Sequence, residues 1–215
     1  MYSIAFGIYS FVRFIGFDVS QSTALPPRPE VPLQYPLLAL HVIFGSVAMV
    51  TAPFQVWPWL RNSRPKVHRR IGLVYYFGGV IPSGILAIPT AVFVSAGQSL
   101  RMALFTLGVL WLFTTYVGFR AALQGRYDDH RRWMVRNVAL TTSIITARLM
   151  FMANFFGIQM LAPDTYPADA RWTFTEAYSA GIWGGLVVHL IIAEWISLRP
   201  RRRARRATRT SVTTG

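Results

Sequence analysis

The chain contains no cysteine, and this absence excludes several kinds of site. Without thiolates, its own residues cannot form a disulfide bond, an iron–sulfur cluster site or a cysteine-based zinc site. A metal ion or a haem would have to be held by histidine, methionine or carboxylate side chains. Histidine is scarce too, because the sequence has only four. Each of the four is therefore a candidate ligand.

Charged residues are also few: they make up 14% of the chain, below the ~25% of ordinary soluble domains. Hydrophobic residues make up 53% and fall into five blocks, each long enough for a helix that crosses ~30 Å of hydrocarbon. A soluble protein of this length could not bury five such segments. The sequence therefore predicts an all-α, polytopic membrane helical bundle. The blocks are Leu37–Trp57, Ile71–Ser95, Met102–Phe119, Val138–Ile158 and Ala177–Leu198.

Residues 1–17 form a shorter apolar block that Arg13 interrupts. This block lacks the basic start and the small-residue cleavage site of a secretory signal peptide. It is either a short additional span or a helix that lies in the membrane interface, and we favour the span. The expected fold therefore has six, possibly five, transmembrane helices.

Acidic residues are the scarcest charged type, with 8 against 22 lysines and arginines. The basic residues concentrate in the alternate segments 58–70, 120–136 and 199–215. Cytoplasmic loops of membrane proteins carry such an excess, so we expect these segments to face the cytoplasm in a bacterial cytoplasmic membrane. The tail 199–215 is expected to be disordered and to attract anionic lipid headgroups. Its charge does not require a specific nucleic-acid partner.

Two stretches of the sequence, 45–72 and 108–134, are similar to each other. In both, an apolar helix is followed by a basic loop, then by His-Arg-Arg and a new helix. Two similar hairpins with one orientation predict four helices that pack with pseudo-symmetry. In such a bundle, His68 and His130 lie at the same depth, near the cytoplasmic edge.

The repeat also suggests a division of the chain. Residues 37–160 are expected to form a four-helix core. Residues 1–36 precede it as an N-terminal helix and an outer loop, and residues 161–198 follow it as an outer loop and the last span. Residues 199–215 form the basic tail.

Three segments can be compared with a known family: RPKVHRRIGLVYYFGG, LWLFTTYVGFRAALQGRYDDHRRWMVRN and TARLMF. They resemble a bacterial family of predicted membrane proteins, the domain of unknown function number 2306. The likeness covers roughly residues 37–160, and the two His-Arg motifs are its specific part. That family has no assigned chemistry, so the resemblance implies architecture only.

The helical core is also similar, more loosely, to di-haem cytochromes of the b-561 type. That likeness implies His68 and His130 as axial ligands of a b-type haem, because such ligands lie on facing helices at one depth. The alternative is that both histidines contact lipid phosphate or cap a loop. A second haem lacks a ligand, since the position in the second hairpin that matches His41 is Ala103.

Arg148 lies deep inside a predicted span, where a charge is costly and normally faces a partner or a wet cavity. Glu194, the only acidic residue within a span, lies near the cytoplasmic end, at a different depth. We therefore expect Arg148 to face a polar cavity bordered by His41 and His189. There it would bind an anion, such as a haem propionate, a quinone oxygen or an acidic substrate. The alternative is a structural arginine satisfied by helix carbonyls and Asn154.

Three functions remain open, and they differ in whether the protein is an enzyme. The first is b-type cytochrome-like electron transfer between a quinol and an acceptor. The second is a cofactor-free membrane enzyme that acts on an isoprenoid or lipid-like substrate in an aromatic-lined cavity. The third is a non-catalytic assembly or copper-handling factor that uses histidine and methionine ligands. The candidate catalytic residues of the second are Arg148, His189, His41 and Glu194.

Overall fold

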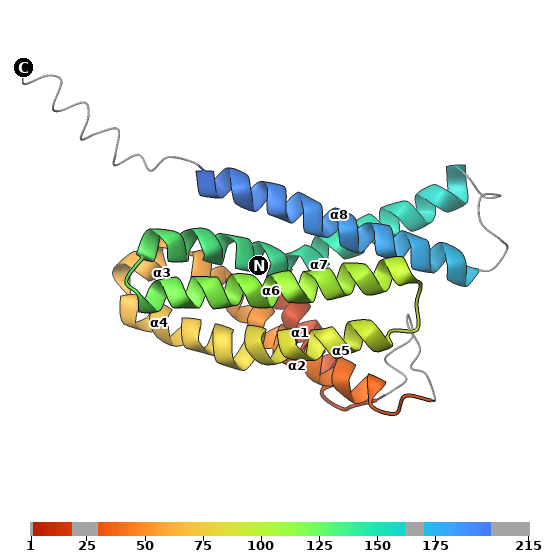
Figure 1. The fold of residues 1–215 in the computed structure, drawn as a ribbon, viewed down its shortest axis with the longest axis horizontal. Helices are drawn as coiled ribbons and strands as arrows, with labels where there is room; N and C mark the ends of the chain where they lie inside the picture. Colours follow the sequence, from red (N-terminus) through yellow and green to blue (C-terminus); the bar gives the residue numbers. More distant parts are fainter. Residues whose placement is uncertain (1, 19–29, 162–169, 199–215) are drawn as a thin grey trace, which may run out of the picture.

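The computed structural model describes residues 2–18, 30–161 and 170–198, and these residues form helices and short connections without a strand (Figure 1). The basic tail lies outside the described residues, so the expectations for it stay predictions. The helices are α1 (Tyr2–Phe14), α2 (Gln34–Val56), α3 (Pro58–Ser63), α4 (Pro65–Leu73), the π-helical η2 (Val74–Val80), α5 (Ile81–Phe93), α6 (Gln98–Leu123), α7 (Tyr127–Leu161) and α8 (Ala170–Leu198).

Five helical segments are long and apolar enough to cross a membrane: α2, the run α4–η2–α5, α6, α7 and α8. They coincide with the five blocks predicted from the sequence, so the helical membrane bundle is confirmed. The helices extend beyond the apolar blocks. The helix α7, for example, begins at Tyr127, whereas its apolar block begins at Val138, because the polar residues between them continue the helix.

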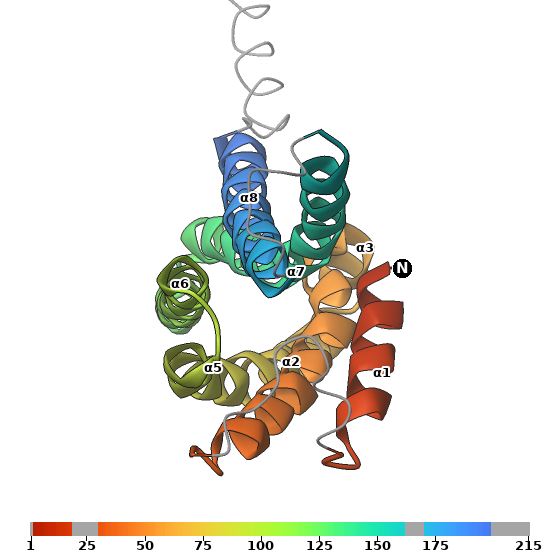
Figure 2. The ribbon, with the colours of Figure 1, turned by 90° about the vertical axis from the view of Figure 1, so that its right-hand side faces the viewer.

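The short helix α1 is not one of these five spans. It has 13 residues and is therefore about 20 Å long, less than the ~30 Å of hydrocarbon that a span must cross. It lies against the outer side of α2 (Figure 2). Gly7 permits this contact, because a Cβ there would be 3.0 Å from both the Ser46 carbonyl oxygen and Val50. The described helices thus give five spans, with α1 packed on the bundle.

The five long helices pack side by side in chain order, and α8 lies along α7 (Figures 1 and 2). We call the end formed by residues 57–70 and 120–136 the basic end, and the end formed by residues 94–98 the opposite end. The helices α2 and α8 begin at the opposite end, and α5 and α7 finish there.

Two glycines one turn apart bring α8 onto α7. A Cβ at Gly181 would lie 2.5 Å from the carbonyl oxygen of Ala147, and one at Gly185 would lie 2.8 Å from that of Ser143. Small residues at this spacing let membrane helices approach backbone to backbone. The pair therefore sets which face of α8 meets α7.

A buried polar cluster joins η2, α6 and α7. The Tyr75 hydroxyl donates to Asn137 Oδ1 at 2.6 Å and lies 2.7 Å from the Thr141 hydroxyl. The indole N–H of Trp111 donates to Thr141 at 2.8 Å. Asn137, which is fully buried, donates to the hydroxyls of Thr114 and Thr115 on α6. Buried polar groups need such partners, so the cluster fixes the relative positions of these three helices.

Candidate functional site

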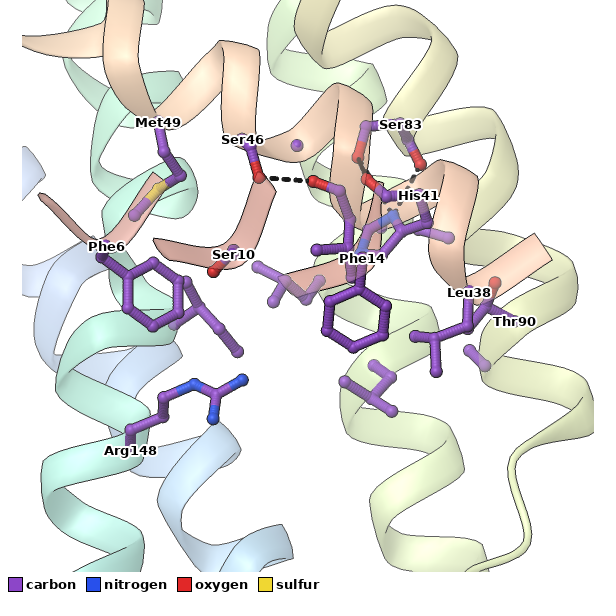
Figure 3. A pocket seen from close by; sticks show the side chains of 18 of the residues that line it. Phe6, Ser10, Phe14, Leu38, His41, Ser46, Met49, Ser83, Thr90 and Arg148 are labelled. Atoms are coloured by element: carbon purple, nitrogen blue, oxygen red, sulfur yellow. Dashed lines mark hydrogen bonds between the residues drawn. The ribbon is translucent and has the colours of Figure 1, made fainter. Parts of the chain in front are cut away.

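A cavity of about 480 Å³ lies between α1, α2, α5, α6, α7 and α8 (Figure 3). Its volume falls in the range of small-molecule sites, roughly 300–1,000 Å³. Most of the lining residues come from the parts of these helices nearer the opposite end, and Met49, Leu140 and Thr141 lie on the other side of the helix midpoints. Most are apolar or aromatic, and they include Phe6, Phe14, Leu107, Trp111, Phe151 and Tyr178.

Polar side chains are a minority of this lining, and none of the described residues that line it is acidic. Trp111 and Thr141 connect its wall to the buried polar cluster. Two cationic side chains, Arg148 and Arg13, also line it. The site is therefore an apolar chamber with a net positive lining.

His41 is held by Ser83 across the contact between α2 and α5. The His41 Nδ1 lies 2.9 Å from the Ser83 carbonyl oxygen, and the Ser83 hydroxyl donates to the His41 carbonyl oxygen at 2.8 Å. A carbonyl only accepts hydrogen bonds, so we assign the proton of the neutral ring to Nδ1. In that tautomer Nε2 carries the lone pair, and within the described residues it has no hydrogen-bond partner. His41 is thus a fixed imidazole whose Nε2 can accept a hydrogen bond or a proton from a bound molecule.

Arg148 lies well within the length of the bundle. The carbonyl of its neighbour Ala147 faces Gly181, eleven residues into α8, which places this level about 17 Å below the start of α8. The Arg148 guanidinium lies 5.2 Å from the centre of the Phe6 ring, and among the described residues it forms no ion pair. Figure 3 shows it beside Phe6 at the cavity. The structure thus places Arg148 and His41 on the same cavity, while their roles stay predictions.

The Phe6 contact does not offset the cost of this charge. An arginine at the centre of a membrane helix costs at least about 2.5–3.5 kcal/mol, whereas a cation–π contact of an exposed side chain contributes about 0.5–1 kcal/mol. Asn154 does not help, because its amide donates to the Met150 carbonyl of its own helix. Because its side chain is exposed at the cavity, water, lipid headgroups or a bound anion can supply the remaining stabilisation of Arg148.

The expectation that His189 borders this cavity is wrong, because His189 is not one of its lining residues. Its Nε2 lies 2.8 Å from the Thr146 hydroxyl, and its Nδ1 lies 3.3 Å from that of Thr142. The glycine face of α8 meets α7, and His189 follows Gly185 by one turn on that face. Two hydroxyls of α7, themselves one turn apart, therefore satisfy both ring nitrogens.

Glu194 lies nearer the basic end and does not line the cavity. It forms a two-pronged ion pair with Arg136, with distances of 2.7 Å and 3.0 Å. The Arg136 guanidinium also lies 4.7 Å from the centre of the Trp133 ring. The carboxylate is about half exposed, and pairs of this kind contribute at most about 1 kcal/mol. The ion pair with Arg136 explains why a carboxylate is tolerated at Glu194. The structure does not bring Glu194 to Arg148.

His68 and His130 occupy equivalent places, each as the fourth residue of its helix, α4 or α7. The two side chains lie near each other at this end. The His130 Nδ1 lies 2.8 Å from the Gly118 carbonyl oxygen, and His68 lies beside the backbone of Phe54. The buried Nδ1 of His68 has no partner among the described residues. The repeat therefore identified two histidines at one end of the bundle, and haem ligation by them stays a prediction.

Sequence reasoning missed three contributors to the cavity. Ser83 is an ordinary serine in an apolar run, and nothing nearby in the sequence links it to His41. Trp111 is one aromatic residue among many. The side chains of α1, such as Phe6, were assigned to a separate span, so their place in the cavity wall was not foreseen.

Comparison with known protein families agrees with this architecture. The model of the family described as predicted membrane protein (DUF2306) matches residues 38–197. The match runs from α2 to the end of α8, so it includes all five spans and extends past residue 160, where the sequence resemblance was expected to stop. The comparisons with curated proteins and with solved structures give no match. Because the matched residues make up more than half of the chain, this integral membrane protein belongs to the DUF2306 family.

Proposed function

We propose that the protein binds an isoprenoid- or lipid-like molecule in the cavity and acts on its polar head, with His41 as the proton-transferring group. The observation that carries the proposal is the cavity itself. It lies between five membrane-spanning segments and α1, its wall is mainly apolar and aromatic, and its polar groups line the same space. Ligand sites commonly combine these three properties.

The hydrogen bonds of His41 support the chemical part of the proposal. Ser83 holds the ring through Nδ1, and Nε2 is then left as the basic nitrogen. A general base needs this combination of fixed orientation and an unprotonated nitrogen close to its substrate. Arg148, on the same cavity, supplies a positive charge for a head group that carries or develops negative charge.

Bound lipid can be tested directly on protein purified from its own membranes. Molecules extracted from the purified protein would be compared by mass spectrometry with the bulk lipids of the same membranes. The test variant is Ala87→Phe, which adds a ring inside the cavity. The matched control is Ile85→Phe, which places the same ring on the exposed side of the same helix.

The expected result is one class of isoprenoid or lipid-like molecule that is enriched on the wild-type protein and on Ile85→Phe but lost from Ala87→Phe. Equal lipid content in all three proteins would contradict the proposal. The variant His41→Gln is expected to bind the same class of lipid. It should hold only the unreacted molecule, because binding would continue without turnover.

Electron transfer through a haem is the second candidate. One observation favours it: the Nδ1 of His130 bonds to a backbone carbonyl, which is how metal-ligating histidines are usually oriented. A haem held by His68 and His130 would give the protein a one-electron redox centre. The absorbance spectrum of the detergent-purified protein tests this idea, with loss of any Soret band expected in both His68→Ala and His130→Ala. A colourless wild-type protein after growth with added haem precursor would exclude it.

A further inference from the structure

We infer that the cavity ligand is a single-chain amphiphile with an oxyanionic head, a carboxylate or a phosphate, and that Arg148 binds this head. This inference rests on the proposed function and specifies the chemical class of its ligand. It differs from the proposed function in one respect, since an uncharged isoprenoid would satisfy that proposal but not this inference.

The first support is the charge of the lining. Arg148 carries a full positive charge inside the length of the bundle, and none of the described lining residues carries a compensating negative charge. Glu194 is engaged by Arg136, and Asp129 by Arg126. A guanidinium binds carboxylate and phosphate through two parallel N–H donors. The lining thus offers Arg148 no anionic partner of its own. A ligand that carries an oxyanion would supply one.

The second support is the position of Arg148 at the edge of the cavity. Its side chain is exposed although it also lines the cavity. The helix α1 packs closely along α2 but touches α7 only slightly, and the contact between Phe6 and Arg148 bridges this gap. We call the line between α1 and α7 at these two residues the seam. A head bound at the seam would replace the Phe6 ring at the guanidinium (Figure 3).

The third support is the shape of the remaining space. Beyond Arg148 the lining consists largely of apolar side chains, among them Leu104, Leu107 and Ile144. A volume of about 480 Å³ is that of a site for a drug-sized molecule, so it accepts one chain rather than a whole two-chain phospholipid. The head would lie at the seam and the chain would extend inward toward Trp111.

The experiment compares three probes with the same twelve-carbon chain: dodecanoate, dodecyl phosphate and dodecanol. Their binding to the detergent-purified full-length protein is measured by displacement of a fluorescent fatty acid. Each probe is compared between wild type and Arg148→Gln, so that its partition into the micelle cancels. Arg120→Gln, which removes an exposed arginine outside the cavity, is the matched control.

In Arg148→Gln, the affinity for the two anions is expected to fall by about tenfold or more, since a charge-assisted pair is lost, while dodecanol binding stays unchanged. Arg120→Gln should bind all three probes as wild type does. The ratio of the losses for dodecanoate and dodecyl phosphate identifies which oxyanion Arg148 prefers. Equal losses for the anions and for dodecanol, or no loss at all, would overturn the inference.

Two further results separate the possible failures. If dodecanol competes as well as the anions and Ala87→Phe abolishes binding of all probes, the lipid-binding cavity stands and only the oxyanion fails. If no probe binds, both proposals fail. Should Arg148→Gln not fold, methyl dodecanoate tests the wild-type protein instead. It keeps the chain and the carbonyl but has no charge, so it must bind more weakly than dodecanoate after correction for partition, and equal binding overturns the inference.

Discussion

Ser83 and His41 are joined by two reciprocal hydrogen bonds across α2 and α5. His41 donates from Nδ1 to the Ser83 carbonyl at 2.9 Å, and the Ser83 hydroxyl donates to the His41 carbonyl at 2.8 Å. Each residue thus satisfies the backbone of the other. The arrangement holds the imidazole at the cavity wall and also ties two spans together.

Ser83→Ala should lower the free energy of unfolding by about 1 kcal/mol, because it removes one interhelical hydrogen bond and leaves the other. The control is Thr90→Ala on the same helix, whose hydroxyl bonds only to the Leu86 carbonyl of its own helix. Thermal denaturation in detergent should show a lower midpoint for Ser83→Ala than for Thr90→Ala. Identical midpoints would mean that the bond between the helices contributes nothing.

His41 and His189 should differ in reactivity toward diethyl pyrocarbonate, which modifies an unprotonated ring nitrogen. Both nitrogens of His189 lie beside threonine hydroxyls, whereas Nε2 of His41 has no partner among the described residues. Peptide mass spectrometry should therefore find faster modification at His41. Added dodecanoate should slow the reaction at His41 alone, and the opposite order of rates would contradict the assigned tautomer.

The close approach of α8 to α7 makes Gly181 intolerant of a side chain. Its added Cβ would lie 2.5 Å from a backbone oxygen that cannot move independently, so Gly181→Ala should cost about 1–3 kcal/mol of stability by overpacking. Gly157→Ala on α7 meets nothing within 4 Å and should instead stabilise its helix by about 0.5–1 kcal/mol. Unfolding titrations in detergent would reveal opposite signs for the two variants.

Asn137 should be the most sensitive position in the buried polar cluster. Replacing it with leucine removes the acceptor of Tyr75 and the donor to Thr114 and Thr115. The hydroxyls of Tyr75, Thr114 and Thr115 keep their bonds to Thr141 and to the Trp111 carbonyl, so the cost is that of the lost bonds, about 0.5–1.5 kcal/mol each. Tyr75→Phe removes only one hydroxyl and should cost less. A smaller loss of stability in Asn137→Leu than in Tyr75→Phe would show that the hydroxyls find other partners.

The absence of cysteine allows single labels to test the topology. Ser63→Cys lies at the basic end and Gln98→Cys at the opposite end, and both positions are exposed. In intact cells, a maleimide that cannot cross the membrane should label only Gln98→Cys, if basic segments face the cytoplasm. Labelling of both positions in intact cells would contradict this orientation.

The spans could be predicted because bilayer thickness sets a minimum length for an apolar run. Their ends could not, because a helix continues into polar residues once it has started, as α7 does from Tyr127. Arg148 was identifiable because a charge inside such a run needs a physical reason. The position of His189 was not, because it depends on the register of α8 on α7, which Gly181 and Gly185 determine through contacts with a distant part of the chain.

The pairing of His41 with Ser83 was beyond sequence reasoning for a related cause. Either residue could have faced lipid, and only the packing of α2 against α5 brings them together. The cavity is a property of several helices at once. Its wall includes α1, which lies outside the residues matched by the family.

The cavity occupies the part of the bundle nearer the opposite end, and this position has a consequence for exchange with the bilayer. Lipids in the two leaflets differ in composition and cross between them slowly. From Arg148 the line along α1 runs past Phe14, which stacks on Tyr35, so the seam would open toward the leaflet at the N-terminal end of α2. The protein would therefore sample one of the two lipid populations, and a molecule confined to the other leaflet would reach Arg148 only after crossing the membrane by another route.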